Sequence, residues 1–478
     1  MLLLAAWLFL VIGWTLLLTT SATLLLPNRS SFYDRLFHCC NPTPSSSTNS
    51  KTKLRILAHL IIHHLILLPI AAYLWTIDEL LFSSYQLIQI KRPVITISVP
   101  RAGTTSLHCN LAKDPNLVTP KTSEFVMPFI CVNILLHQLH QRIPLVLAKV
   151  EQVLKYLNGV TSEVEARHPV SLFSPEADDV LLGEWHWVAV GSVRTFPVLE
   201  NWWNNYDFSS FHMEERRRIM NFHSRICKKV LYLRSRSRSD LSGSDGDLRL
   251  LLRSHLSTCI DDFIEMYPDA IFVGILRDPI DVLRSFAGLS NAVVQGATGV
   301  QMLPQIMSGE GMEDTCMNKV KSRDENIPLQ KKRHLNKFEM KTWPEGMQLI
   351  LEDMMGREAN LFNTCGSEFK NKIGVEVKGG ISSGWIHFSS FKDDPVAAIQ
   401  NLYATVGMQM SAEFKANLTQ DAHIQEHTKY KAKHVYSNPT LKKMGVNEEQ
   451  FLALPGVKLY KGLFEGKKTQ TQHQIKFM

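Results

Sequence analysis

The stretch Pro93–Pro115, PVITISVPRAGTTSLHCNLAKDP, contains the features that decide the fold. Residues 94–99 form a short apolar run rich in β-branched residues, which is typical of a strand buried on both faces of a sheet. Gly103 permits a tight turn, and from Thr104 onward apolar residues recur at helical spacing until Asp114, which precedes a proline. The sequence therefore predicts a strand, a tight loop and a helix in that order.

The loop at the start of this predicted helix has the chemistry of an anion site. Free N–H groups of the first helical turn point into such a loop, and the helix dipole favours negative charge there. Arg101 adds a fixed positive charge, and three hydroxyl side chains add donors: Thr104, Thr105 and Ser106. The nucleotide loop GxxxxGK(S/T) needs a second glycine and a lysine, which this stretch lacks. We therefore predict a phosphate-binding loop of another kind.

The motif PRAGTTSLH resembles the 5′-phosphosulfate-binding loop of sulfotransferases, which usually reads P-(K/R)-(S/A/G)-G-T-T. That family uses 3′-phosphoadenosine 5′-phosphosulfate (PAPS) as its sulfonate donor. The resemblance implies that the loop residues bind the 5′-phosphosulfate of the donor: Arg101, Ala102, Gly103, Thr104, Thr105 and Ser106.

A second element of the same kind lies in Tyr267–Leu289. Residues 270–276 predict another buried strand, which an Arg-Asp-Pro turn joins to a helix. In the sulfotransferase family such a strand–RDP–helix element binds the 3′-phosphate of the donor through the Arg and a Ser eight residues on. Here these residues are Arg277 and Ser285. The planar guanidinium suits a phosphate because it can donate two parallel hydrogen bonds.

Length and composition fit a membrane anchor followed by one large domain. The chain has 478 residues, of which 45% are hydrophobic, and a formal net charge of +7. This small net positive charge, spread along the chain, suits an anionic cofactor, an acidic substrate or a membrane surface. It does not indicate nucleic acid as a partner. The resemblance to sulfotransferases covers most of residues 93–440.

We predict an α/β fold with a central, mostly parallel sheet flanked by helices, of the P-loop-like sulfotransferase type. The donor is expected along the carboxyl ends of the strands. The predicted domain covers residues 90–445, with inserts at about 234–247 and 300–345, and a C-terminal tail covers residues 446–478.

Two apolar stretches precede the predicted domain. Residues 1–26 are long enough to span a bilayer, and a signal peptide cleaved near Ser21 is the alternative, although no Lys or Arg precedes the run. Residues 56–76 are just long enough to cross, but three histidines and a proline also fit an interfacial or packed helix. The linker 27–55 is basic.

The positive-inside rule places this basic linker in the cytoplasm and the domain that follows residue 76 on the other side of the membrane. We therefore expect a membrane protein of the Golgi with a lumenal catalytic domain. This topology predicts glycosylation at Asn417 and none at Asn28.

The transfer reaction needs a base that takes the proton from the attacking hydroxyl or amine. Glycan-modifying sulfotransferases commonly carry a Lys/Glu-Pro-x-Phe-Phe-like segment after the loop, and its Glu is the base; Glu124, followed by Phe125, occupies a similar place, about one residue out of register. Glu184 and His186 are alternatives, because they would share one face of a strand in LLGEWHW (181–187).

Two further cationic segments are candidates for the donor site. Residues 228–235, KKVLYLRS, predict a third apolar strand ending in a cation. Related sulfotransferases often have V-L-K-S-P here, with the Lys on the phosphosulfate bridge, so the resemblance implies that role for Arg234. Residues 429–437 resemble the closing basic segment of the family, in which Lys431 and Lys433 would contact the 3′-phosphate.

The C-terminal half predicts two more elements. Residues 384–391 are expected to form the last strand, and Asp394-Pro395 to start an amphipathic helix closed by Gly407. The eight cysteines show no zinc-ligand spacing such as CxxC, so no metal is predicted. In a lumenal domain six of them could pair, in a connectivity that the sequence does not fix: Cys109, Cys131, Cys227, Cys259, Cys316 and Cys365.

The predicted function is transfer of a sulfonate group from PAPS to a hydroxyl or amine of an acceptor, a glycan in the first place. A lipid or a small alcohol is the alternative acceptor. A membrane-tethered, non-catalytic protein with the same fold is a second alternative. A nucleotide-dependent kinase would need a Walker lysine and a metal-holding acid, which we do not find.

Overall fold

A computed structural model describes residues 2–27, 54, 57–58, 60–157, 160–169, 171–188, 208–238, 248–298, 343–363, 382–428 and 438–475. Within these residues the strands are β1 (Val94–Ile97), β2 (Leu117–Val118), β3 (Arg249–Ser254), β4 (Ile271–Leu276) and β5 (Ser382–His387). The strands form one sheet in the order β2-β3-β1-β4-β5.

All the strand pairs in this sheet are parallel. Val94 of β1 lies opposite Leu251 of β3 on one side and Ile271 of β4 on the other. Parallel strands end at a common edge, so the loops after β1, β3 and β4 lie close together. Every residue of β1 and β4 is buried, as expected for central strands covered on both faces. The predicted α/β fold with a mostly parallel sheet is confirmed.

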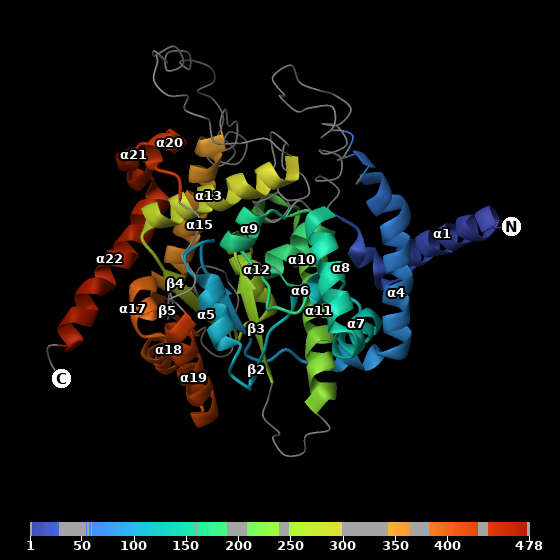
Figure 1. Cartoon of the computed structure of the whole chain (residues 1–478), viewed down its shortest axis with the longest axis horizontal. Coiled ribbons are helices and arrows are strands. Elements are labelled where there is room, and N and C mark those ends of the chain that lie inside the picture. The colour runs from blue at the N-terminus through green and yellow to red at the C-terminus, as the bar shows by residue number, and fades with distance from the viewer. Residues whose placement is uncertain are drawn as a thin grey trace, which may run out of the picture.

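Helices surround the sheet (Figure 1). Their bounds are α1 (Leu2–Thr19), α4 (Leu68–Leu81), α5 (Thr104–Leu111), α6 (Thr122–Val126), α7 (Ile130–Arg142), α8 (Pro144–Leu157), α9 (Ser162–Arg167), α10 (Asp178–Trp185), α11 (Met213–Arg238), α12 (Ile260–Met266), α13 (Pro279–Thr298), α15 (Trp343–Asn363), α17 (Phe388–Asp393), α18 (Pro395–Thr405), α19 (Ala412–Thr428), α20 (Leu441–Met444), α21 (Glu448–Ala453) and α22 (Pro455–Ile475). Shorter turns are η1 (Ser21–Leu25), η2 (His63–Leu67), η3 (Ser83–Leu87), η6 (Phe208–Ser210) and η7 (Ser257–Cys259).

The two strand–loop–helix elements predicted from the sequence are present as β1–α5 and β4–α13. The predicted helix start at Asp394 is also confirmed, because its carboxylate accepts the N–H of Ala397 at 2.9 Å and caps α18. Gly407 follows α18 with φ +68°, in the left-handed region that favours glycine.

The strand predicted at residues 228–235 is wrong, because these residues belong to the long helix α11. Phe222, Ile226 and Val230 are buried at four-residue spacing, so the apolar pattern of the whole segment is helical and only its last part resembles a strand. The strand that takes this place in the sheet is β3, which starts at Arg249.

The strand predicted at residues 181–187 is also wrong. Residues 181–185 complete helix α10 and residues 186–187 follow it; the helix begins with two acidic residues, Asp178 and Asp179, as the dipole of a helix N-terminus favours. The last strand is shorter than predicted, since β5 ends at His387 and the next six residues form α17.

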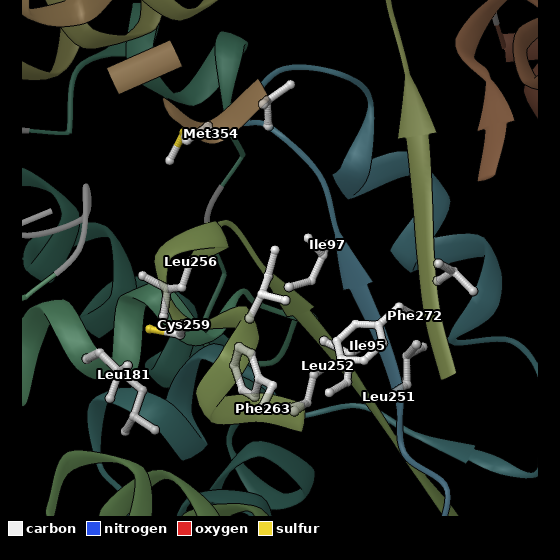
Figure 2. Packing of buried hydrophobic residues seen from close by; sticks show 14 of the residues in the cluster. Ile95, Ile97, Leu181, Leu251, Leu252, Leu256, Cys259, Phe263, Phe272 and Met354 are labelled. Carbon is white, nitrogen blue, oxygen red and sulfur yellow. The ribbon is translucent and has the colours of Figure 1, made fainter. Parts of the chain in front are cut away.

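The core contains side chains from the central strands and from the helix that follows β3. Figure 2 shows Ile97 of β1, Leu252 of β3 and Phe263 of α12 in one packed region. Each of the three is at most 1% exposed. Dense packing of this kind fixes the strand ends, and with them the loops that extend beyond the sheet.

The segment expected to be a C-terminal tail, residues 446–478, contains α21 and α22. Helix α22 packs against α15, and its residues Val457 and Tyr460 are fully buried. At Gly456 the two helices come so close that an added Cβ would lie 2.1 Å from the carbonyl oxygen of Glu352.

Helices α1 and α4 pack against each other at one end of the molecule (Figure 1). Among the described residues, one helical stretch of 22 residues, Leu60–Leu81, is long and apolar enough to cross a membrane: an 18-residue window within it has mean hydropathy 1.9, and 39% of that window is buried within the fold. The apolar stretch Trp7–Thr19 in α1 is shorter. Both membrane crossings remain predictions.

The end of this longer apolar helix is built into the domain. The carboxylate of Asp78 accepts the N–H groups of Ile130 and Cys131 at the start of α7, at 2.7 and 3.0 Å. The same carboxylate pairs with Lys229 of α11 at 2.9 Å, and both side chains are buried. Asp78 therefore attaches the end of this helix to α7 and α11 of the domain.

Leu26, which follows α1 and η1, also contacts the domain. Its carbonyl oxygen accepts hydrogen bonds from Arg218 of α11 at 2.6 Å and from His186 at 3.0 Å. Residue 26 therefore lies beside Arg218 and His186 of the domain, and the two-crossing topology stays a prediction.

Candidate functional site

The loop between β1 and α5 has the backbone of a binding loop. Arg101 has φ +72° and Gly103 has φ +113°, so two residues of a four-residue turn lie in or beside the left-handed region. For a side chain as large as arginine this conformation is uncommon and costs free energy, and such residues concentrate at functional sites. Helix α5 then begins at Thr104, with its free N–H groups facing the loop.

Gly103 is required by space as well as by backbone conformation. An added Cβ would lie 2.6 Å from the ring of Phe388, at the start of α17, and 3.2 Å from Ile275 of β4. The loop is therefore in close contact with β4 and with the helix that follows β5.

The structure brings together the two elements that the sequence assigned to one donor. The guanidinium of Arg101 donates through Nε to the hydroxyl of Ser285 on α13 at 3.1 Å. The guanidinium of Arg277, at the end of β4, donates through Nη1 to the backbone carbonyl of Arg101 at 3.1 Å. These contacts follow from the sheet order, because β1 and β4 are neighbours and their carboxyl ends meet.

Arg277 has the surroundings of an anion-binding residue. Its guanidinium carbon lies 4.8 Å from the ring centroid of Phe388, and Asp281, an exposed carboxylate, lies 3.5 Å from Nη2. Its Nε is buried and has no hydrogen-bond partner within the described part of the chain. A buried donor without a partner is costly, so this geometry fits a site in which a ligand oxygen accepts that N–H.

A second cation lies at the end of the neighbouring strand β3. Arg253 is 2% exposed and forms an ion pair through Nη2 with Glu176, which is also buried. Its Nε and Nη1 are buried without a partner among the residues that the structure describes. Arg253 therefore has two nitrogens, Nε and Nη1, whose N–H groups are unpartnered within the described residues, which again fits an anionic ligand.

His255 follows β3 and is fixed by the same loop. Its Nδ1 lies 2.9 Å from the carbonyl oxygen of Ser98, an atom that only accepts, so Nδ1 carries the proton and donates it. Burial and the positive charge of Arg253 lower the pKa of His255 to about 3. The ring is therefore neutral at pH 7, and its Nε2 has a lone pair that can take a proton.

The end of α9 completes this group of residues. Arg101 donates through Nη1 to the backbone carbonyl of Arg167 at 3.1 Å. His168 lies 4.0 Å from the Glu176 carboxylate, and burial lowers the pKa of His168 despite that neighbour. The site therefore contains the arginines Arg101, Arg253 and Arg277. It also contains the neutral histidines His168 and His255. This charge pattern is typical of a site for a multiply charged anion.

Glu124 and Arg234, two of the predicted site residues, form an ion pair with each other. Arg234 Nη1 lies 2.7 Å from one carboxylate oxygen, and Nη2 donates to the other at 3.0 Å. The second oxygen also accepts the backbone N–H of Lys121 at 2.8 Å. The carboxylate of Glu124 is thus held by three donors, and Arg234 lies on a helix and not at the end of a strand.

The alternative candidates Glu184 and His186 lie on and directly after α10, a helix. His186 is fully buried; its Nδ1 donates to Leu26, and its ring packs edge-on against Phe222 at 4.6 Å. These neighbours belong to the N-terminal segment and to α11. Lys431 and Lys433 lie outside the described residues.

Sequence reasoning missed Arg253, His255 and Glu176. A usable signal was present at residues 250–254, where three consecutive leucines are followed by Arg-Ser. This run fits the V-L-K-S-P pattern better than KKVLYLRS does, with Arg in place of Lys and His255 in place of Pro. It was overlooked because the earlier apolar run occurs first after the loop.

Within the described part of the chain, no group of three or more His, Cys, Asp or Glu side chains is arranged to hold a metal ion. The cysteines described are free: Cys109, Cys131, Cys227 and Cys259.

Comparisons with known proteins bear on this site. Residues 93–307 match the model of the sulfotransferase family, a region that contains the β1 loop and the β4–α13 element. No curated protein matches the chain. This match supports a sulfotransferase family for residues 93–307.

Two solved structures resemble the chain. Sulfotransferase STF1 from Mycobacterium tuberculosis H37Rv is 14% identical, with a TM-score of 0.51 over 90% of this chain and 92% of that one. Sulfotransferase STF9 from Mycobacterium avium is 14% identical, with a TM-score of 0.49 over 90% of this chain and 95% of that one. The likeness to STF1 shows the fold alone, because the identity is low.

Proposed function

We propose that this chain, whose family match and fold support a sulfotransferase, transfers a sulfonate group from PAPS to a hydroxyl or amine of an acceptor, and that the acceptor is a glycan. The observation that carries this proposal is the direct contact between Arg101 and Arg277, together with Ser285. A nucleotide with a 5′-phosphosulfate and a 3′-phosphate needs two cationic sites close to each other, and these residues supply them.

In the proposed complex the loop residues 101–106 bind the 5′-phosphosulfate, and Arg277 with Ser285 binds the 3′-phosphate. Arg253 takes the role that the sequence assigned to Arg234, since it stands at the end of a central strand and its Nε and Nη1 have no partner among the described residues. Its positive charge would stabilise the negative charge that develops on the bridging oxygen as the S–O bond breaks.

We assign the general base to His255 in place of Glu124. Support comes from its neutral ring, its fixed tautomer and its position beside Arg253. In the reaction the acceptor oxygen attacks sulfur, the S–O bond to the phosphate breaks, and Nε2 of His255 takes the acceptor proton. The negative charge of a bound donor raises the low pKa of His255, which makes the ring a better base in the complex than in the free protein.

The function is tested by incubating the full-length protein with PAPS that carries ³⁵S in the sulfonate, over a panel of glycans, glycolipids, sterols and small alcohols. We expect labelled product with glycan acceptors. Label on a lipid or a small alcohol alone would correct the acceptor class. Tight binding of 3′,5′-bisphosphoadenosine without transfer to any acceptor would instead indicate a non-catalytic protein with this fold.

Membrane attachment is the second part of the proposal. Exposed apolar side chains are concentrated on α1, on the helix 60–81 and on α7–α8; examples are Trp7 at 59%, Leu65 at 52% and Leu145 at 80%. On helix α8, Glu151 accepts hydrogen bonds from residues 171–172 and Lys155 pairs with Glu165, so these two charged side chains face the domain. An apolar helix face that points outward is typical of a surface that meets lipid.

Because Leu26 contacts the domain and Gly13 of α1 packs against Pro69, we propose that α1 and the helix 60–81 meet the membrane together, on one side of the domain. We keep the lumen of the Golgi as the proposed place of the domain; the basic linker 27–55, which follows Leu26, then starts on the lumenal side, contrary to the positive-inside rule. Asn417, in α19, is partly exposed and remains the predicted glycosylation site.

A further inference from the structure

A buried carboxyl group holds the start of the loop between β1 and α5 through a hydrogen bond. Glu358 of α15 is fully buried, and its Oε2 accepts the backbone N–H of Val99 at 2.9 Å. The side chain of Ser98 also forms a hydrogen bond with it. Val99 is two residues before Arg101, so this carboxyl fixes the backbone from which the loop turns.

Helix α22 supports the other half of the site. The hydroxyl of Tyr460 accepts the backbone N–H of Arg277 at 3.1 Å, and Tyr460 is fully buried. Helices α15 and α22 pack against each other, and both lie beyond residues 93–307, the part that matches the sulfotransferase family. The two halves of the donor site are therefore held by one helix pair outside the matched region.

The surroundings of Glu358 contain little that stabilises a negative charge. The groups facing it are the Val99 N–H and the Ser98 hydroxyl from the end of β1, and Tyr460 from α22, which also lies near Arg277 and Asp278. Its Oε1 is buried and has no partner among the described residues. A buried carboxylate with so few partners costs free energy. The protonated carboxyl avoids this cost and adds no negative charge next to the loop that is proposed to bind the anionic donor.

We infer that Glu358 is a positioning residue that holds the β1 loop for the anionic donor while its carboxyl is protonated, and that its ionised form repels the donor. This inference rests on the proposed function. Burial raises the pKa of Glu358 to about 8, in agreement with a neutral side chain at pH 7. Each pH unit above the pKa removes about nine-tenths of the remaining protonated form, so donor affinity should fall by up to ~10-fold per unit.

The test is the dissociation constant of 3′,5′-bisphosphoadenosine, measured by calorimetry on the full chain from pH 7.0 to 9.5. The affinity of the wild-type protein should fall above pH 8. Glu358→Gln should bind as the wild type does at pH 7 and lose this fall, because the amide keeps an acceptor for Val99 and cannot ionise. Glu352→Gln, on the same helix, should retain the wild-type profile. The same profile in wild type and Glu358→Gln would overturn the inference.

A second measurement needs no variant. Nucleotide binding at pH 8.5, measured in buffers of different ionisation enthalpy, should be accompanied by uptake of up to about three-quarters of a proton per nucleotide, because binding selects the protonated carboxyl and about a quarter of the free protein already holds that proton. Binding without proton uptake would contradict the inference and leave the proposed function intact. Wild-type protein that binds no nucleotide at any pH would overturn the proposed function, and this role of Glu358 with it.

A steady-state readout separates positioning from catalysis. Above pH 8 the wild-type protein should show a raised KM for PAPS at a nearly unchanged kcat, and Glu358→Gln should restore the low KM. A fall in kcat alone would contradict a positioning role.

Discussion

His255 and Glu124 are the residues that distinguish the two accounts of proton transfer. His255→Ala should lower kcat by about 10²–10⁴-fold, the usual contribution of a general base. Glu124→Gln should change kcat little, since its carboxylate is held by Arg234 and by the Lys121 N–H. Transfer rates at saturating PAPS measure both. A large loss in Glu124→Gln with none in His255→Ala would restore the base expected from the sequence.

Glu358 also makes the stability of the fold depend on pH. Its pKa is about 8 in the folded protein against an ordinary value of 4.5, so between these pH values the folded state holds a proton that the unfolded state has lost. This group therefore lowers stability as pH rises from 4.5 to 8, by about 1.4 kcal/mol per unit, and contributes nothing below 4.5.

Denaturant unfolding at pH 6 and pH 8 measures this effect. Glu358→Gln should lose less stability than the wild type between the two values, while Glu352→Gln should follow the wild type. Parallel losses in all three proteins would show that Glu358 does not titrate in this range.

Single residues were predicted unevenly from the sequence. Arg101, Arg277 and Ser285 were found because each lies within a short motif with a fixed spacing, and the structure brings the three together. Glu358 was not, because nothing within α15 indicates that this carboxyl faces a loop about 260 residues earlier. Long-range burial of a polar group is a property of the packed fold and has no local sequence pattern.

At the scale of elements, the β1–α5 turn depends on Gly103. Gly103→Ala should destabilise the protein by about 1–3 kcal/mol, because the residue has φ +113° and the ring of Phe388 must move. Gly407→Ala is the matched control: Gly407 has φ +68° and no atom within 4 Å, so only the backbone cost of about 1 kcal/mol applies.

Thermal unfolding of these two variants measures the difference, and nucleotide binding should weaken only in Gly103→Ala. Equal losses of stability, with binding unchanged in both, would mean that close packing at the loop is unimportant.

The elements that were predicted correctly are those with several local signals in one short stretch. The β1–α5 and β4–α13 units combine a β-branched run, a turn residue and a helical pattern. The error at α11 arose because eight residues of a 26-residue amphipathic helix look like a strand when taken alone. To identify β3, one must choose between the apolar runs 228–235 and 249–254. That choice depends on which run pairs with β1 in the sheet, and the local sequence does not show this pairing.

At the scale of the whole molecule, the contacts of Leu26 make a prediction about topology. Protease added to sealed microsomes should leave the domain and residues 27–55 intact, because Leu26 lies on the side of the domain and we place the domain in the lumen. Treatment with glycosidase should shift the protected domain through Asn417. A protected N-terminal tag with cleavage within residues 27–55 would indicate the two-crossing hairpin instead.

The sheet order and the family match leave one claim on which the whole account depends, namely that a single nucleotide contacts both Arg101 and Arg277. The most direct measurement compares the affinities of 3′,5′-bisphosphoadenosine and adenosine 5′-phosphate for the wild type, Arg101→Ala and Arg277→Ala. Arg277→Ala should weaken binding of the bisphosphate by ~1.5–3 kcal/mol, about 10–150-fold, and leave the 5′-phosphate unaffected. Arg101→Ala should weaken both ligands. If Arg277→Ala leaves bisphosphate binding unchanged, or weakens both ligands equally, Arg277 does not bind the 3′-phosphate and the account is contradicted.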